Sequence, residues 1–346
     1  MTGGRSNCGG ETDMWLKVAS SGCGCAARIG YVQRKTRDDT ERSDEPASET
    51  SCATVGRNTQ PTRSVMKRCG FSLVEVMVVI STVSVVMAVT MPAMNTARSR
   101  ARAIVCRSNL RQLVLANIGY SNDHDGYYVP AADDFLVTDG LMPLQGGYHR
   151  WHGRRIAGDM PFDPLKGPLV GYLADGKVKK CPERVEFSKS QDGMINFERG
   201  CGGYGYNMQY LGSRLWCSGI TTYTALKNSY AKTTNAVEVK RTAETLMFAD
   251  TAFWEQSQSL IVEYSFAESP YYVVDGKPDV GGGALGYPSP SIHFRHYGSA
   301  NVGWADGHVE AKPMANMQGQ AGYDADSAKM NIGWFEPVDN TLFDLE

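Results

Sequence analysis

The chain has 346 residues, of which 42% are hydrophobic and 21% charged, and its formal net charge at pH 7 is −2. That length allows up to two domains. After Gly70 there are 24 Lys and Arg residues against 29 Asp and Glu, a net charge of −5, which argues against nonspecific nucleic-acid binding.

Residues 1–65 differ in composition from the rest of the chain. They combine Gly, Ser, Thr, Arg and Asp without apolar periodicity, and mixed charges crowd the run from Lys35 to Thr50. Such a sequence builds no hydrophobic core. We expect either a disordered extension or a misassigned start, with Met66 as the true first residue. Cys23 and Cys25 have no second pair at zinc-ligand spacing, so we interpret them as chance.

Residues 71–91 form the feature around which the chain is organised. They are 21 residues whose only charge is Glu75. As a helix they would reach about 31 Å, the thickness of a bilayer core. A carboxylate in such a span is costly unless it finds a partner. The sequence therefore predicts a membrane-spanning helix with a functional Glu75.

The residues around this span resemble the leader and cleavage site of type IV prepilins and type II secretion pseudopilins. The resemblance rests on four features. A short leader at 66–70 contains the basic residues Lys67 and Arg68 and ends at Gly70. The aromatic residue Phe71 follows the glycine, the acid Glu75 comes four residues later, and Pro92 falls at position twenty-two of the mature chain. An ordinary signal anchor is the alternative that hydrophobicity alone leaves open.

The resemblance implies specific roles for these residues. A prepilin peptidase would cut after Gly70 and methylate the new terminal amine of Phe71. Glu75 would then pair with the terminal amine of a neighbouring pilin or pseudopilin subunit, and Pro92 would kink the helix. The protein would be a single-pass protein of the inner membrane with its body outside the cytoplasm, able to join a pseudopilus. Basic residues lie on both sides of the span, in the leader and near 98–102, so the positive-inside rule does not decide its orientation in the membrane. The predicted orientation therefore depends on the resemblance.

The residues that follow the predicted membrane span, 92–346, indicate an α+β fold. Residues 92–120 continue the helix with an amphipathic pattern, and the turn formers at 122–126 end it. Residues 121–346 are expected to form the extracytoplasmic globular domain, mainly an antiparallel sheet with long loops at 129–180 and 276–290, as in a pilin. The strongest strand predictions are 245–250, 259–266 and a hairpin of 301–305 with 308–311.

The turn of that hairpin completes a second motif, H-x9-D-G, at residues 296–307. It resembles the prepilin-processing-associated C-terminal domain. We expect His296 to buttress the hairpin, and Asp306 with Gly307 to fix its turn. A divalent-metal site is the alternative, with His293, His296 and His308 as ligands together with Asp250 and Asp306. No cofactor is otherwise expected.

Cysteines and aromatic residues carry the remaining expectations. Four cysteines follow the cut and allow up to two disulfides in three connectivities, Cys106, Cys181, Cys201 and Cys217. The aromatic residues at 204, 206, 210 and 216 could line a glycan groove, although core packing is the commoner use. We predict a structural subunit of a type II secretion or type IV pilus-like system, not an enzyme. A membrane-anchored glycan- or ligand-binding protein is the alternative, and a metal-dependent hydrolase is a third.

Overall fold

A computed structural model of the chain describes residues 70–136, 147–158, 160–188, 197–217, 223–257, 259–274, 276–283 and 286–346. The chain divides into two units, Met1–Ile80 and Ser81–Glu346, with the boundary inside the first helix. The described part of the first unit, residues 70–80, begins that helix. The second unit holds all the strands described below.

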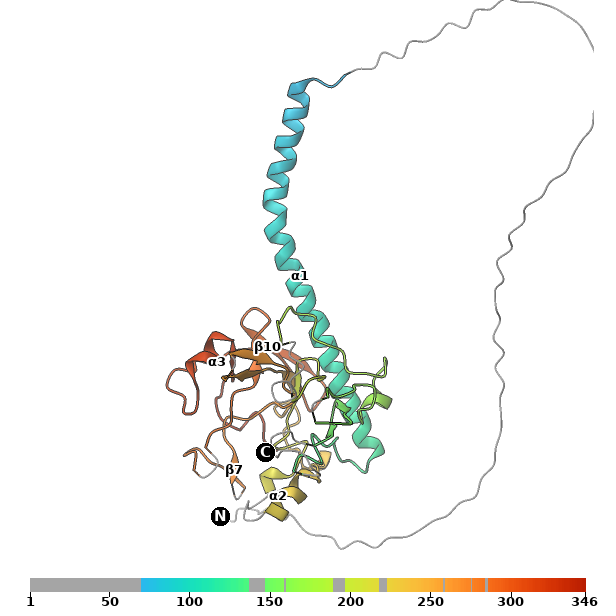
Figure 1. Ribbon diagram of the computed structural model, residues 1–346, viewed down its shortest axis with the longest axis vertical. Coiled ribbons are helices and arrows are strands. Elements are labelled where there is room, and N and C mark those ends of the chain that lie inside the picture. The colour runs from blue at the N-terminus through green and yellow to red at the C-terminus, as the bar shows by residue number, and fades with distance from the viewer. Residues whose placement is uncertain are drawn as a thin grey trace, which may run out of the picture. The chain divides into compact units, whose positions relative to one another are not determined.

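Helix α1 (Leu73–Asp123) joins the two helical segments that the sequence predicts into one element of 51 residues that continues through Pro92 (Figure 1). It ends where predicted: Gly126 takes a φ of +83°, which favours glycine, and its N–H donates to the Ser121 carbonyl at 2.8 Å. Residues 71–98 are exposed throughout, whereas from Ala103 to Ser121 one face is buried. The amphipathic pattern of that second half is therefore confirmed.

The other elements are short. The remaining helices are α2 (Tyr223–Tyr230) and α3 (Ala325–Lys329), with single 3-10 turns at Val170–Tyr172, Leu215–Cys217 and Ala236–Glu238. The strands are β1 (His149–Arg150), β2 (Gly153–Arg154), β3 (Tyr204–Tyr206), β4 (Leu246–Asp250), β5 (Phe253–Glu255), β6 (Leu260–Val262), β7 (Val273–Val274), β8 (Lys277–Pro278), β9 (Ile292–His293), β10 (Ser299–Trp304), β11 (Val309–Pro313) and β12 (Ile332–Gly333).

A four-stranded antiparallel sheet in the order β11-β10-β4-β3 is the centre of the fold. All five residues of β4 are buried, as its apolar sequence predicts for a central strand. Val302 of β10 pairs with Glu310 on one side and with Ala249 on the other. The predicted strand at 245–250 and the predicted hairpin are confirmed, and with them the coarse α+β class.

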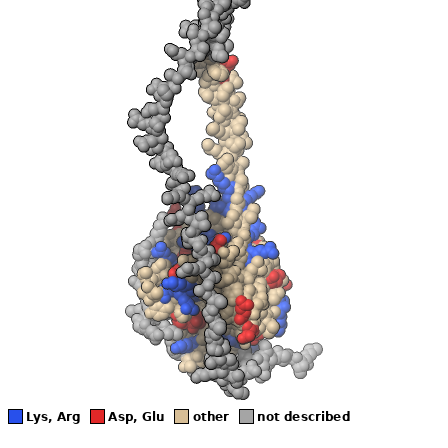
Figure 2. All heavy atoms as spheres, turned by 90° about the vertical axis from the view of Figure 1, so that its right-hand side faces the viewer, with Lys and Arg blue, Asp and Glu red and all other residues tan. Residues whose placement is uncertain are grey.

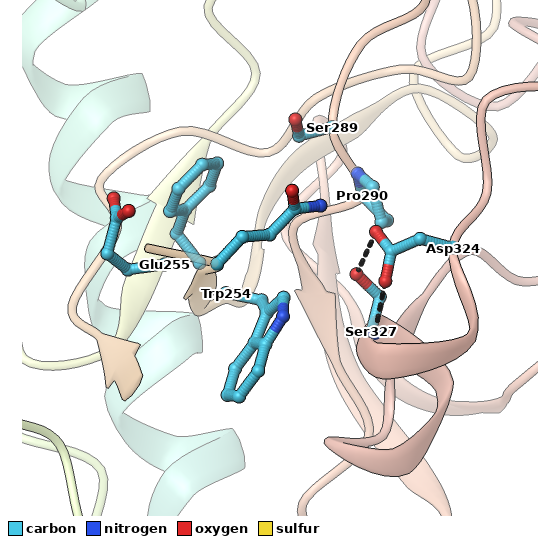
Figure 3. A pocket seen from close by; sticks show the side chains of 8 residues that line it. Trp254, Glu255, Ser289, Pro290, Asp324 and Ser327 are labelled. Atoms are coloured by element: carbon cyan, nitrogen blue, oxygen red, sulfur yellow. Dashed lines mark hydrogen bonds between the residues drawn. The ribbon is translucent and has the colours of Figure 1, made fainter. Parts of the chain in front are cut away.

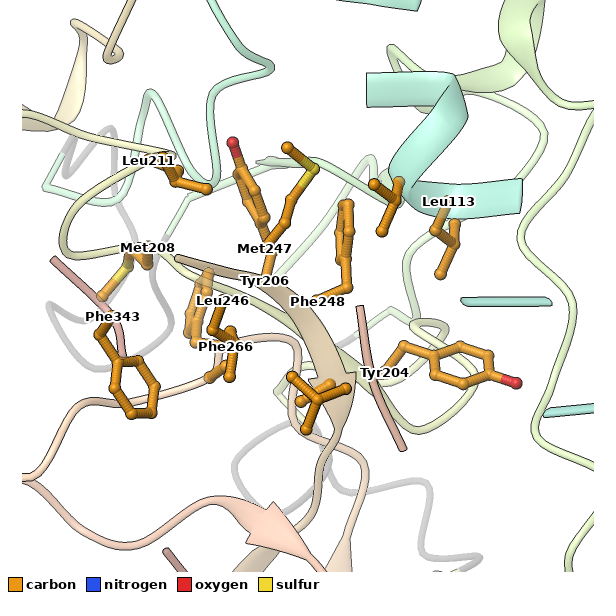
Figure 4. Close-up of a cluster of buried hydrophobic side chains, with 14 of the residues drawn as sticks. Leu113, Tyr204, Tyr206, Met208, Leu211, Leu246, Met247, Phe248, Phe266 and Phe343 are labelled. Carbon is orange, nitrogen blue, oxygen red and sulfur yellow. The ribbon is translucent and has the colours of Figure 1, made fainter. Parts of the chain in front are cut away.

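The second half of α1 packs against this sheet at very close range. A Cβ at Gly303 would lie only 2.7 Å from Val114 Cγ2, so glycine is needed for the helix to approach β10. Figure 4 shows Leu113 of α1 in one apolar cluster with side chains of β3 and β4. Asn109 and Asn117 donate to the hydroxyls of Tyr204 and Tyr206, each at 3.2 Å. The helix is thus held by apolar packing and by buried hydrogen bonds together.

Two sequence predictions need correction. The strand predicted over 259–266 is shorter, because after β6 the chain leaves its hairpin and Phe266 bridges Tyr206 in the parallel direction. The loop predicted over 276–290 begins within a small hairpin, since Val274 pairs with Lys277. The predicted loops at 129–180 are confirmed where they are described, with only two-residue strands and one 3-10 turn.

Candidate functional site

The exposed half of α1 is the first candidate site. It is long and apolar enough to cross a membrane, and none of its most apolar stretch is buried inside the structure. Phe71, which precedes the helix, is 86% exposed, and nothing surrounds Gly70 within 4 Å of a Cβ built on it. The predicted leader residues 66–69 lie outside the described part of the chain. A helix that buries none of these side chains needs another apolar environment.

Glu75 has a local role at the start of this helix. Its Oε2 atom accepts a hydrogen bond from the Ser72 backbone N–H at 2.8 Å. This contact satisfies one of the donors that a helix leaves unpaired at its N-terminus. The carboxylate therefore lies at the first turn of the apolar segment, four residues after Phe71.

Basic side chains follow the apolar segment. Figure 2 shows Lys and Arg gathered on α1 where it approaches the body of the second unit. The exposed arginines of this stretch are Arg98, Arg100 and Arg107, whereas Arg102 is bound to Glu183, with Nε 3.0 Å from Oε1. Exposed arginines next to an apolar span are suited to anionic lipid headgroups.

The H-x9-D-G motif places its histidine and its aspartate at opposite ends of β10. Asp306 lies in the tight turn to β11, where its Oδ1 accepts from the His308 backbone N–H at 3.0 Å, and Gly307 takes a φ of +99°. His308 Nδ1 lies 2.6 Å from the same Oδ1. The structure therefore gives Asp306 the turn-fixing contacts that the sequence predicts, and it places Asp306 away from His296.

His296 instead belongs to a buried cluster with Asp250, Cys106 and Cys181. Cys106 lies on α1, Asp250 ends β4, and His296 precedes β10. One ligand-type atom from each of the four residues lies within 4.8 Å of the others. We refer to these four residues as the thiol-imidazole cluster. Of these four residues, His296 and Asp250 were predicted from the sequence as possible metal ligands, whereas the two cysteines were not.

Three contacts define the inside of the thiol-imidazole cluster. His296 Nε2 lies 3.3 Å from Asp250 Oδ2 and 3.5 Å from Cys181 Sγ. Cys106 Sγ lies 3.1 Å from the other carboxylate oxygen, Oδ1. Cys106, Asp250 and His296 are each at most 5% exposed. The four polar groups therefore converge within the protein and not on its surface.

The electrostatics of the cluster separate its two thiols. Burial raises the pKa of Cys106 well above its ordinary value, and Asp250 adds to that rise. The pKa of Cys181 falls to about 5, because it accepts from Cys106 and His296. Burial alone would lower the pKa of His296, but its contacts with Asp250 and Cys181 raise it to about 9. Charged forms of Cys181 and His296 thus stabilise each other.

A second layer of side chains holds the cluster. Glu183 Oε2 lies 3.7 Å from His296 Nδ1, the ring nitrogen that faces away from Asp250. Arg102 fixes Glu183 from α1, and Ser99 donates to it at 3.2 Å. The Asn301 backbone N–H donates to Asp250 Oδ2 at 2.9 Å. These contacts restrict the orientation of both the imidazole and the carboxylate.

The disulfides considered from the sequence are not present. All four cysteines that follow Gly70 are described, and all are free thiols. Cys201 is buried in the main core, and Cys217 Sγ accepts from Arg214 at 3.5 Å. Cys106 and Cys181 lie in one cluster and interact with each other as separate thiols. Cys106 Sγ also contacts the Asp250 carboxylate, and Cys181 Sγ also contacts the His296 imidazole. A second ligand-type group, Asp133, Asp134 and His149, is partly exposed, and Asp134 accepts from backbone N–H groups.

The tyrosines suggested for a glycan groove are core residues. Tyr204, Tyr206 and Tyr210 are at most 5% exposed, and the Tyr210 hydroxyl accepts from Asn340 at 2.8 Å. An aromatic cavity of about 310 Å³ exists elsewhere, lined in part by Tyr230, Tyr264, Phe266, Glu268 and Tyr272. The core-packing interpretation of Tyr204, Tyr206 and Tyr210 is thus confirmed. The aromatic cavity is lined by other aromatic residues, which have no local sequence pattern that distinguishes them.

A second cavity of about 240 Å³ is lined by residues of β5 and by Asp324 and Ser327 at the start of α3 (Figure 3). The Asp324 carboxylate accepts from the Ser327 N–H at 2.6 Å and from its hydroxyl at 2.9 Å. Asp324 is therefore committed to capping the helix.

Glu268 in the aromatic cavity predicts an unusual pH dependence of stability. Burial raises its pKa from 4.5 to about 7, although the Tyr264 hydroxyl donates to it at 2.8 Å. Since the folded pKa is the higher one, this contribution to stability is complete below pH 4.5 and is lost as the pH rises through 7. Glu268→Gln should match the wild type in acid and exceed it above neutrality by up to about 3 kcal/mol.

Denaturant unfolding of the detergent-solubilised chain at acidic and alkaline pH measures this difference. Glu244→Gln, at an exposed position, is the matched control and should show no pH-dependent gain. Equal stability of wild type and Glu268→Gln at alkaline pH would show that Glu268 is not a buried acid.

Comparison of the chain with protein-family models, with curated proteins and with solved structures finds no match.

Proposed function

We propose that this protein is a pseudopilin-like structural subunit of a type II secretion or type IV pilus-like system. In this proposal it is cut after Gly70, methylated at Phe71, anchored by residues 71–91 in the inner membrane and carried with its body outside the cytoplasm. Its partners are a prepilin peptidase and other pilin or pseudopilin subunits. No catalytic step is assigned to it.

One observation carries the proposal. The exposed apolar first half of α1 has a single acid, Glu75, in its first turn, and an exposed Gly70–Phe71 bond lies just before it. A plain membrane anchor needs the apolar residues but not the acid, since a carboxylate there costs free energy unless a partner compensates it. A neighbour's terminal amine would be such a partner, and helices of this kind can pack together in a filament.

Ligand binding is the second candidate function, and the aromatic cavity supports it. Tyr230, Tyr264 and Tyr272 provide faces suited to stacking, and Glu268 provides one polar group. Retention of the protein on a polysaccharide matrix would favour this function, whereas copurification with secretion or pilus components would favour assembly. Hydrolysis is less well supported, because Cys106, Asp250 and His296 are all buried and present no open face to a substrate.

Gly70→Ala tests the processing step. Coexpressed with a prepilin peptidase, the wild type should lose all residues up to Gly70, and Gly70→Ala should keep them, because the peptidase has little room beside the cut. Gel mobility and mass of the membrane fraction measure the difference. Ser72→Ala, two residues beyond Gly70, should be cut normally. Cutting of Gly70→Ala at the wild-type rate would contradict this assignment.

A further inference from the structure

We propose that the thiol-imidazole cluster is a structural zinc site, in which Cys106 Sγ, Cys181 Sγ, one oxygen of Asp250 and Nε2 of His296 bind one Zn²⁺. The ligand set is a reasonable one for zinc, which takes thiolate, imidazole and carboxylate ligands and is almost always four-coordinate in structural sites. The proposal goes beyond the assembly role and does not depend on it.

The distances fit a tetrahedron. With zinc bonds of about 2.3 Å to sulfur and about 2.0 to 2.1 Å to nitrogen and oxygen, neighbouring ligand atoms lie roughly 3.3 to 3.8 Å apart. His296 Nε2 lies within this range of both Asp250 Oδ2, at 3.3 Å, and Cys181 Sγ, at 3.5 Å, whereas Cys106 Sγ lies 3.1 Å from the other carboxylate oxygen, Oδ1. With one ligand atom taken from each residue, all four atoms lie within 4.8 Å of one another. Side-chain shifts of about 1 Å or less would complete the site.

The surroundings have the features that support a metal-bound histidine. Nε2 of His296 points into the cluster, and Nδ1 is buried without a hydrogen bond, 3.7 Å from the Glu183 carboxylate. A small rotation of the ring on metal binding would let Nδ1 donate to Glu183, as an outer carboxylate commonly accepts from a metal-bound histidine. The Tyr204 hydroxyl donates to Cys106 Sγ at 3.5 Å and would stabilise a thiolate there. Asn301 holds Asp250 through its backbone N–H.

The charges also balance. Zn²⁺ with two thiolates, one carboxylate and a neutral imidazole carries a net charge of −1. Arg295, adjacent in sequence to His296, interacts electrostatically with Asp250 and Cys181 and supplies the compensating charge. Its guanidinium is fixed by donating to the carbonyls of Gly203 and Thr251. A buried metal site without net charge avoids the cost of an unpaired buried ion.

The site would connect segments that are far apart in the sequence. Its ligands come from α1, from the loop at 181, from the end of β4 and from the residues before β10. Four protein ligands leave no open coordination position, so the role is structural and not catalytic. The ion would fasten the buried half of α1 to the central sheet, beside the hydrogen bond from Asn109 to Tyr204.

Zinc content of the purified full chain tests the proposal. Prepared in detergent with zinc present and then dialysed, the wild type should retain about one zinc ion more per chain than Cys106→Ser or His296→Gln. The test compares the zinc content of wild type and variants, and not the total zinc content, because the five cysteines before Gly70 could also bind zinc. Cys217→Ser removes a cysteine outside the cluster and should keep the full zinc content.

Two further measurements keep the test valid if the ligand variants unfold. Glu183→Gln leaves all four ligands in place and should weaken zinc binding about 10- to 100-fold in competition with a chelator. Wild type loaded with Co²⁺ should show thiolate-to-cobalt charge transfer and the intense ligand-field bands of a tetrahedral ion. Equal zinc content in wild type and both ligand variants, or a Cys106–Cys181 cross-linked peptide in an unreduced digest, would overturn the proposal.

Discussion

Glu75→Val should be inserted and cut after Gly70 like the wild type, but it should not enter filaments. The substitution makes the span more apolar, so insertion is favoured. It also removes the only charge in residues 71–91, so no carboxylate remains to pair with a neighbour's terminal amine. We expect loss of the protein from sheared filaments or from cross-linked oligomers, with unchanged amounts in the membrane fraction.

Two matched variants separate the charge from other properties of Glu75. Glu75→Gln keeps a side-chain oxygen that can accept from the Ser72 N–H, as the carboxylate does at 2.8 Å, yet it has no charge and should also fail to assemble. Thr82→Val makes the same helix more apolar and should assemble normally. Assembly of Glu75→Gln at the wild-type level would mean that the helix-capping contact matters and the charge does not.

Glu198→Ala should be the most destabilising single substitution in the globular unit. Arg150 and Glu198 are a fully buried pair, with Arg150 Nη2 2.6 Å from Glu198 Oε1 and Nε 2.8 Å from Oε2. Ser265 completes the carboxylate's hydrogen bonds at 2.6 Å. Without Glu198 the remaining carboxylate near the buried guanidinium is that of Asp134, 4.0 Å from Arg150 Nη1. Breaking a buried ion pair in this way costs about 3 to 5 kcal/mol.

Denaturant unfolding of the full chain in detergent measures that loss. Lys329→Ala is the control: it removes an exposed ion pair, in which Lys329 Nζ lies 2.7 Å from Asp326 Oδ1. Because exposed ion pairs contribute little to stability, the unfolding midpoint should not change. A similar midpoint for Glu198→Ala and Lys329→Ala would show that Arg150 finds another partner or reaches water.

The elements with strong local signals could be predicted from the sequence. The sequence of residues 71–120 specifies one long helix. Residues 71–91 are a long apolar run with a single charge, the residues after them have helical periodicity, and the turn formers that end the helix begin at Asn122. Asp306 and Gly307 specify the β10–β11 hairpin, because the turn needs a residue with positive φ and a side chain that caps it. These features depend only on neighbours in the chain.

The thiol-imidazole cluster could not be predicted in the same way. Cys106 and Cys181 meet only because α1 crosses the sheet where Gly303 permits its approach. The sequence does show that Cys106 falls on the apolar face of its helix, but a buried cysteine on such a face is usually a small core residue. The buried pair of Arg150 and Glu198 was missed for the same reason: long-range contacts have no local pattern.

The first residue of the mature protein tests the central claim most directly. Protein isolated from the membranes of cells that contain a prepilin peptidase should begin, by intact mass and N-terminal peptide sequencing, at Phe71 with a methylated amine. A chain that still carries the residues before Phe71 in such cells would contradict the claim that this is a pseudopilin-like subunit.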